Sequence, residues 1–361
     1  ENTFSIKFST TDETDFSDNV VEGSIFGMST IPARKAFIEE GTGAWCGWCP
    51  RGHVGLEELG ENHHDKTTLV AVHVGDDMEI AEYGSNGINN EIAGYPSGLI
   101  NRSGEEDPGD FVDVYNGYIA LANPVAISGA ASWSGNTLTI TSNIEFYAPM
   151  NSALKVNAII VEDNVTGPSP AYDQVNYYSS QNQNIALVGA GHDWQAEPDP
   201  VPASDMVYNH VARAIIGGWD GETSTQSSFA TNDVYTHTFT IDLGDMTVLD
   251  VNNLSVIITA QDIETGEVYN SEYAEYAVGI AEIADVKELT IFPNPASDFV
   301  TIPNLGTEKG TYNIINVKGQ VVANGSVSSN EKIDITALTD GFYSIQVTTN
   351  ENQYVGKIVK R

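Results

Sequence analysis

Hydrophobic residues follow two different patterns along the chain, and the change between the patterns falls near residue 123. Before it, residues 36–38 and 68–74 form almost continuous apolar runs, which are typical of strands buried on both faces. Residues 46–60 form a weakly helical segment, for which Gly60 is a stop signal. Residues 110–122 predict a second helix, because their apolar positions share one helical face: Phe111, Val114, Tyr115, Tyr118 and Ile119.

From about residue 124 to residue 284, apolar and polar residues alternate within residues 138–146, 154–160, 235–243 and 254–260. This alternation predicts antiparallel strands with one buried face, and the Gly, Asn and Asp turns between them favour a β-sandwich. Residues 163–208 interrupt the pattern with a long polar and aromatic insertion, and loops of such length are usually functional or disordered. A packed cover over the neighbouring domain is the favoured interpretation, and a recognition surface for protein partners is the alternative.

Charge divides the chain a second time. The formal net charge of −35 disfavours nucleic acid and anionic membranes as partners, and a solvated acidic surface is the simplest explanation for it. Residues 285–361 contain eight Asp or Glu and seven Lys or Arg, a balance of −1, whereas residues 1–284 carry −34. We therefore place a domain boundary near Asp285. The alternating apolar positions beyond it predict a small β-sandwich: Val300, Ile302, Ile314, Val317, Tyr343, Ile345 and Val347.

The chain has only two cysteines, and both lie in the stretch Trp45-Cys46-Gly47-Trp48-Cys49-Pro50. A disulfide framework would use several cysteines spread along the chain, and a zinc site would need a second Cys pair or a spaced His pair. The motif therefore indicates a redox dithiol at the start of a helix. No metal and no cofactor is expected.

The residues around the two cysteines suggest a division of roles. Free N–H groups at a helix N-terminus favour a thiolate at Cys46, so we expect Cys46 to be the nucleophile and Cys49 to resolve the mixed disulfide. Gly47 leaves room for a substrate chain to approach. Trp45 and Trp48 flank the motif with apolar surface and are the candidate substrate contacts.

Residues 31–123 resemble a thioredoxin-like domain, on the basis of the cysteine motif and of Tyr95-Pro96 downstream of it. In that family a cis-proline loop faces the two cysteines, so the resemblance implies this role for Pro96 and substrate binding by Tyr95 and its backbone. The resemblance also implies a buried acid that accepts a proton from the resolving cysteine. Glu40 matches that acid by spacing, and Glu39 is its competitor, because the two should face opposite sides of a strand.

The order of a thioredoxin-like domain and a β-domain resembles the Omp28-related outer membrane protein family. The matching residues are Glu39-Glu40-Gly41-Thr42-Gly43, Cys46, Cys49-Pro50 and Tyr95-Pro96. Residues 285–361 resemble a type IX secretion C-terminal sorting domain, and this match is the most specific in the sequence. The matching stretches are residues 291–298, 315–320, 338–343 and 357–361.

Together the two resemblances imply a secreted or outer-membrane-associated bacterial protein whose tail is read by the type IX secretion machinery. On physical grounds alone, an adhesive β-module fits the tail equally well. No apolar run is long enough to span a membrane. The start at Glu1 rather than Met indicates that an export signal has already been removed.

Other groups of polar residues give weaker evidence about function. His210 has no carboxylates or other histidines around it in sequence, so a hydrogen-bonded structural histidine is favoured over a metal ligand. The acids at Asp76-Asp77 and between Asp199 and Asp205 raise the alternative of Ca²⁺ binding, which no EF-hand spacing supports. No nucleophile-elbow pattern indicates a hydrolase.

The sequence thus predicts an α/β thioredoxin-like domain followed by all-β sandwich domains. The predicted parts are an N-terminal extension at 1–30, the thioredoxin-like domain at 31–123, a β-sandwich domain at 124–284 with the insertion at 163–208, and the sorting domain at 285–361. The first functional hypothesis is a secreted or cell-surface thiol–disulfide oxidoreductase with protein thiols or disulfides as partners. The alternative is a surface binding or structural protein in which Cys46–Cys49 is a static disulfide, although so short a loop gains little stability from closure.

Overall fold

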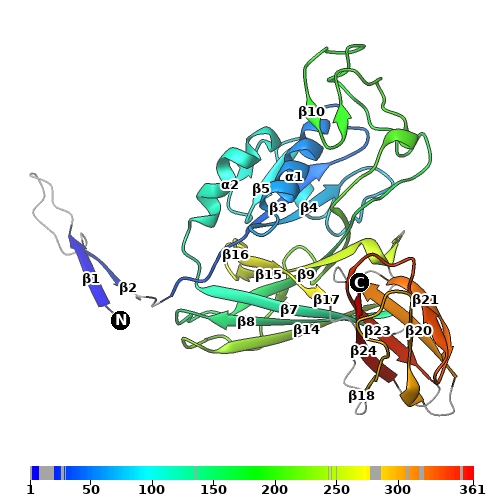
Figure 1. Ribbon diagram of the computed structural model, residues 1–361. Helices are drawn as coiled ribbons and strands as arrows, with labels where there is room; N and C mark the ends of the chain where they lie inside the picture. Colours follow the sequence, from blue (N-terminus) through cyan, green and yellow to red (C-terminus); the bar gives the residue numbers. More distant parts are fainter. Residues whose placement is uncertain are drawn as a thin grey trace, which may run out of the picture. The chain divides into compact units, whose positions relative to one another are not determined.

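The computed structural model of the protein (Figure 1) describes residues 2–7, 20–25, 28, 30–134, 136–242, 244, 246–248, 250–276, 286–305, 309–316, 321–349 and 353–361. The chain divides into two compact units, Glu1–Glu275 and Tyr276–Arg361. The boundary predicted at 284/285 lies outside the described residues. Strands prevail in both units, and no helix in the described ranges has the length and apolar character needed to cross a membrane.

The predicted N-terminal extension contains two strands, β1 (Asn2–Lys7) and β2 (Val20–Ile25), which pair antiparallel.

One large mixed sheet organises the first unit (Figure 1). Its strand order is β16 (Val268–Tyr273), β15 (Leu254–Asp262), β9 (Leu154–Glu162), β12 (Val211–Ile216), β4 (Thr67–His73), β3 (Ala36–Thr42), β5 (Ser97–Ile100) and β6 (Glu105–Glu106), and β13 (Glu222–Thr223) pairs with β9. The two halves meet at β12, which is parallel to β4 at the pair Val211/Ala71 and antiparallel to β9. The prediction of a boundary between separate domains at 123/124 is therefore wrong for the sheet. β12 covers the edge of β4 that the earlier strands leave unpaired.

Two helices, α1 (Pro50–His63) and α2 (Phe111–Ile119), pack against β3, β4 and β5, and the short helices η1 (Ile88–Asn90) and η2 (Pro108–Asp110) lie in the connections. The predicted face of α2 is confirmed: Phe111 and Tyr115 are buried, and Val114, Tyr118 and Ile119 pack against the same cluster. Helix α1 begins later than predicted and continues through Gly60 to His63.

A second antiparallel sheet contains β14 (Val234–Asp242), β8 (Thr137–Phe146), β7 (Val125–Ser134) and β17 (Glu275–Tyr276), and η5 (Val251–Asn253) precedes β15. Its apolar face packs against β9 and β15 and forms the predicted sandwich. The expectation of one buried face holds for β8 but is wrong for β9 and β15. Their opposite face carries Ile159 and Ile257, which pack with Phe37 and Val70 of the large sheet. Leu243, at the end of one predicted strand, lies outside the described residues.

The 163–208 insertion has a core of its own. It contains β10 (Val188–Gly189), β11 (His192–Asp193) and η3 (Ala203–Asp205), and Figure 1 shows β10 beside α1. Its buried side chains cluster with Ala44 and Met78: Val165, Tyr178, Trp194, Val201, Met206 and Tyr208. The insertion is therefore packed against the segment that carries the cysteines, in agreement with the interpretation of a packed cover.

The second unit has two sheets. The larger has the order β18 (Val286–Glu288), β24 (Gln353–Lys360), β23 (Gly341–Thr348), β20 (Lys309–Asn316) and β21 (Val321–Ser328), and the smaller pairs β19 (Phe299–Thr301) with β22 (Lys332–Asp334). The short helix η6 (Pro303–Leu305) follows β19. Val300 and Ile333 of the small sheet share one core with Ile314, Ile345 and Ile358 of the large sheet, as expected for a small β-sandwich. Residues 317–320, which include the predicted core position Val317, lie outside the described residues.

Candidate functional site

Cys46 and Cys49 form a disulfide immediately before helix α1, with a Cα–Cα distance of 5.3 Å. Cys49 is the N-cap residue, and Pro50 is the first helical residue. The N–H of Cys49 donates to Cys46 O at 3.1 Å, and the N–H of Gly52 donates to Cys49 O at 2.8 Å. Cys46 therefore lies in the turn that leads into the helix, and the prediction that it begins the helix is wrong, because the helix begins at Pro50. Both cysteines are buried, but Cys46, at 4% exposed, is more accessible than Cys49, at 0%.

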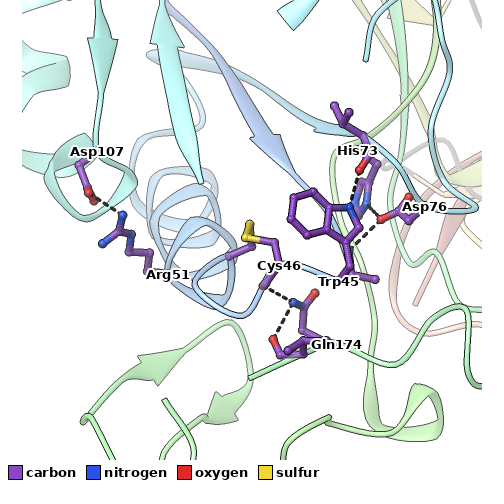
Figure 2. Close-up of a disulfide and its surroundings, with 11 residues drawn as sticks. Trp45, Cys46, Arg51, His73, Asp76, Asp107 and Gln174 are labelled. Carbon is purple, nitrogen blue, oxygen red and sulfur yellow. Dashed lines mark hydrogen bonds and ion pairs between the residues drawn. A yellow bond between two sulfur atoms is a disulfide. The ribbon is translucent and has the colours of Figure 1, made fainter. Parts of the chain in front are cut away.

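Hydrogen bonds from the end of β4 hold the loop before the cysteines (Figure 2). Trp45 Nε1 donates to Val74 O at 2.6 Å, and Ala44 N donates to Asp76 Oδ2 at 2.8 Å. His73 Nδ1 lies 2.7 Å from the same Asp76 oxygen. Burial alone would raise the pKa of Asp76, but His73 and the backbone hydrogen bonds lower it below its ordinary value. Asp76, which the sequence raised as an acid for Ca²⁺, thus fixes the loop.

Glu40 and Glu39 point to opposite sides of β3, as the strand alternation predicts. The Glu40 carboxyl group faces α1, where a Cβ atom at Gly52 would overlap Glu40 Oε1. Glu40 is 0% exposed, and neither of its carboxylate oxygens has a hydrogen-bond partner among the described residues. Burial raises the pKa of Glu40 from 4.5 to about 8, against smaller opposing effects of Thr42 and Arg51. The carboxyl group therefore carries a proton near neutral pH.

Glu39 is part of a buried ion pair. It accepts a hydrogen bond from Tyr83 Oη at 2.6 Å and from Arg102 Nη2 at 2.7 Å. The guanidinium group of Arg102 lies 3.8 Å from the centre of the Trp219 ring. Because these partners occupy the carboxylate, Glu39 has a structural role, and Glu40 is the acid on the side of the cysteines.

A small polar cavity of about 30 Å³ lies beside Glu40. Its lining includes Glu40, His53, Leu56, Ala71, His73 and Tyr208, together with Glu57, Asn209 and His210. This volume suffices for a water molecule, which needs at least about 10–15 Å³ and polar partners. Burial, together with smaller effects of the neighbouring His73 and His192, lowers the pKa of His53 from 6.5 to about 3. His53 could not be identified from the sequence, since a single His on a helix has no distinctive spacing.

The Tyr95–Pro96 loop lies on the Trp45 side of the cysteine motif. The Tyr95–Pro96 peptide bond is cis, and Pro96 is buried. The Tyr95 ring meets the Trp45 ring edge to face, with centroids 5.4 Å apart. Trp45 is 48% exposed. The Trp45 ring, next to Cys46 in the sequence, thus contacts Tyr95, the residue that precedes the cis-proline Pro96.

Gly47 and Trp48 lie on the other side and are covered by the insertion. A Cβ atom at Gly47 would overlap the Tyr177 ring, so Tyr177 fills the space that we expected a substrate chain to use. The Trp48 ring meets the rings of Tyr177 and Tyr178 edge to face, each at 5.5 Å. The four predicted substrate contacts therefore divide into Trp45 and Tyr95, of which Trp45 is exposed, and Gly47 and Trp48, which the insertion covers.

Arg51 and His210 have structural partners. Arg51 Nη2 lies 2.7 Å from Asp107 Oδ2 and points away from the disulfide, which ties the first turn of α1 to η2 (Figure 2). The backbone N–H of His210 donates to Asp163 Oδ1 at 2.7 Å, and burial lowers the pKa of the His210 ring. This agrees with a hydrogen-bonded structural histidine. In the part of the chain that the structure describes, no three His, Cys, Asp or Glu side chains are grouped as a metal would require.

Comparisons with known proteins match two parts of the chain. The family model described as outer membrane protein Omp28 matches residues 87–274, and the model described as a secretion system C-terminal sorting domain matches residues 290–361. The first range includes Tyr95 and Pro96 but begins after Cys46 and Cys49. The comparison with curated proteins gave no match.

Two solved structures are similar to the chain at low sequence identity. HBP35 of Porphyromonas gingivalis is 15% identical, with a TM-score of 0.47, over 91% of this chain and 98% of its own. A protein from Agrobacterium tumefaciens is 13% identical, with a TM-score of 0.41, over 68% of this chain and 96% of its own.

Proposed function

This chain belongs to the Omp28 outer membrane protein family, and from that premise we propose that it is a surface thiol–disulfide oxidoreductase acting through Cys46 and Cys49. It is a secreted or outer-membrane-associated protein, because the family and the sorting domain agree on this location. The type IX sorting tail interacts with the secretion machinery. The proposed substrates are thiols or disulfides of other proteins.

The proposed reaction is a reversible exchange between the protein disulfide and a substrate dithiol. A substrate thiolate attacks Cys46 Sγ, the S–S bond breaks, and Cys49 leaves as a thiolate that takes up one proton. The second substrate thiolate then attacks the substrate sulfur of the mixed disulfide, and Cys46 leaves as a thiolate that takes up a second proton. Two electrons pass to the protein, which ends with two thiols, and the substrate ends as a disulfide. The reverse direction begins with the Cys46 thiolate attacking a substrate disulfide.

One observation carries the proposal, namely the buried carboxyl group of Glu40 behind the cysteine turn, which has no hydrogen-bond partner among the described residues. Glu40 lies against Gly52, in the first turn of the helix that Cys49 caps. A pKa of about 8 lets this group give a proton to the leaving Cys49 thiolate and take it back in the reverse direction. A buried carboxyl group without a hydrogen bond lowers stability, so its presence here favours a functional role over a structural one.

We further propose that residues 31–123 form a thioredoxin-like unit. In support, β3 and β4 are parallel, α1 follows the cysteines, the cis Tyr95–Pro96 bond precedes β5, and β5 is antiparallel to β3. The two-residue strand β6 pairs with β5, and α2 follows it. The unit departs from an isolated domain at β12, which extends the sheet beyond β4.

A second candidate function is a surface binding or structural protein in which the disulfide is permanent. The low exposure of both cysteines beneath the insertion favours it. Because a static disulfide needs no proton donor, this alternative leaves the state of Glu40 unexplained.

The reduction potential of Cys46–Cys49 distinguishes the two functions. We would equilibrate the full chain against glutathione buffers at pH 7 and trap free thiols, with Cys46→Ser and Cys49→Ser as controls for the trapping. A potential of roughly −120 to −270 mV is expected for an exchanging dithiol. A potential below about −300 mV would overturn the proposal and support the static disulfide.

The role of Glu40 has a separate readout. Glu40→Gln keeps the shape of the side chain but removes the transferable proton, so it should slow exchange at pH 7 by roughly 10²-fold, the lower end for a general acid–base group. Gln183→Ala, an exposed change on the insertion, should leave the rate unchanged. An unchanged rate in Glu40→Gln would remove Glu40 from the mechanism.

A further inference from the structure

The insertion pairs with the backbone on one side of the cysteine motif. Val175 N donates to Ala44 O at 2.8 Å, and Tyr177 N donates to Gly47 O at 2.9 Å. These two carbonyl groups flank Cys46 in the sequence. An extended substrate that binds through its own backbone would need free groups of this kind next to the reacting sulfur. Here the chain itself has already bonded them.

Gln174 closes the same side with its side chain (Figure 2). Its Nε2 donates to Cys46 O at 3.0 Å, and the residue is completely buried. The backbone of Gln174 exchanges two hydrogen bonds with Val201, at 2.8 and 3.0 Å. Val201 belongs to the core of the insertion together with Trp194 and Tyr208. The groups that cover Cys46 are therefore anchored in a packed unit, and opening this side would break several contacts together.

The opposite side of Cys46 is open by comparison. Trp45 is 48% exposed, and its indole is held in place by the hydrogen bond to Val74 O and the edge contact with Tyr95. Tyr177, on the closed side, is 37% exposed and lies over Gly47, so it forms the rim of the cover. The exposed Trp45 ring therefore marks the side from which we expect a thiol to approach Cys46.

We propose that Gln174 and Tyr177 are specificity-determining residues, which restrict the disulfide to thiols on a narrow carrier that enters along Trp45 and Tyr95. The inference deepens the proposed oxidoreductase function and rests on it. The selected substrate class is an unfolded polypeptide segment or another slender thiol compound. A thiol on the surface of a folded protein is excluded, because the folded body would have to occupy the space of Tyr177 and its neighbours.

The test compares two thiol probes on the full chain. Reduced glutathione is the narrow probe, and a small folded protein with one surface thiol of similar pKa is the wide probe. We would measure the second-order rate of attack on the disulfide for the wild type, Tyr177→Ala and Gln174→Ala. Each variant should accelerate the wide probe by at least about tenfold, the effect of removing roughly one hydrogen bond or an equivalent contact from the cover. The glutathione rate should change by less than about twofold, because its path is already open.

Matched controls distinguish easier access to the disulfide from a general loosening of the fold. Gln183→Ala changes an exposed glutamine of the same insertion, and Tyr147→Ala changes a tyrosine outside the insertion whose side chain donates a hydrogen bond to Glu145. Both should leave the ratio of the two rates unchanged. Equal acceleration of both probes in Tyr177→Ala, or no acceleration of the wide probe, would overturn the proposal. If the buried Gln174→Ala variant fails to fold, the two rates measured for Tyr177→Ala test the proposal on their own.

The outcome is independent of the reduction potential. A potential outside the exchanging range would remove the oxidoreductase function, while the ratio of the two rates would still report the shape of the access. Conversely, an exchanging potential with equal rates for both probes would keep the function and remove the selectivity.

Discussion

Glu40 and Gly52 meet where β3 passes beneath the first turn of α1, and the carboxyl group of Glu40 occupies the space of a missing side chain at residue 52. Gly52→Ala should therefore displace Glu40 or the helix and lower the free energy of unfolding by about 1–3 kcal/mol, the usual cost of overpacking. Urea denaturation with the disulfide intact measures it. The matched control is Gly117→Ala in α2, where nothing lies within 4 Å of the added atom, and it should stabilise the protein by about 0.5–1 kcal/mol.

The double variant Glu40→Ala/Gly52→Ala tests whether the two residues act on each other. Removing the carboxyl group empties the space that the added methyl group needs. Gly52→Ala should therefore lower the free energy of unfolding less in the Glu40→Ala background than in the wild type. Equal costs in both backgrounds would show that the destabilisation has another origin.

Glu40 should also make the stability depend on pH in an unusual direction. Its pKa is raised in the folded protein to about 8 from 4.5, so between these values the folded state keeps a proton that the unfolded state releases. Stability therefore falls as pH rises, by up to about 1.4 kcal/mol per pH unit from this group. Glu40→Gln has no such dependence, so its stability relative to the wild type should increase progressively from pH 5 to pH 8. A constant difference between the two proteins over this range would contradict the buried, unpartnered state of Glu40.

His53 should make the stability of the protein depend on pH in the acidic range. Its pKa is lowered to about 3 from 6.5, so between these values the unfolded state binds a proton and the folded state does not. Stability contributed by the neutral ring is lost as pH falls, by up to about 1.4 kcal/mol per pH unit. His53→Asn should lose some packing against Trp194 and Tyr208 at every pH, but it should decline less than the wild type between pH 6 and pH 4. The free energy of unfolding of both proteins would be measured by urea denaturation at each pH. An equal decline between pH 6 and pH 4 in the two proteins would contradict the prediction.

The residues that the sequence identified correctly are those whose signals are local. The spacing of Cys46 and Cys49 needs only a turn, the opposite orientation of Glu39 and Glu40 follows from strand alternation, and the buried face of α2 follows from helical periodicity. Each depends on neighbours within a few residues.

The features that the sequence did not reveal depend on pairing between distant segments. β12 joins β4 through backbone hydrogen bonds, which carry no side-chain signature and give no means of choosing a partner. The same holds for Val175 and Tyr177, which bond to Ala44 and Gly47 through the main chain. Gly47 was expected to admit a substrate, and a glycine looks the same in sequence whether its space is open or filled by Tyr177.

Glu39 and Glu40 are adjacent acids, both fully buried, and their amide variants should have opposite effects. Glu39 is paired with Arg102, so Glu39→Gln leaves a buried guanidinium group without its counter-ion and should destabilise the protein by about 3–5 kcal/mol. Glu40 has no hydrogen-bond partner among the described residues, so Glu40→Gln should stabilise the protein at pH 8. The double variant Glu39→Gln/Arg102→Met should recover part of the loss, because no unpaired charge remains. Urea denaturation of the three variants at pH 8 measures these effects, and a loss of stability in Glu40→Gln like that in Glu39→Gln would mean that Glu40 has a hydrogen-bonded partner in solution and is no free proton donor.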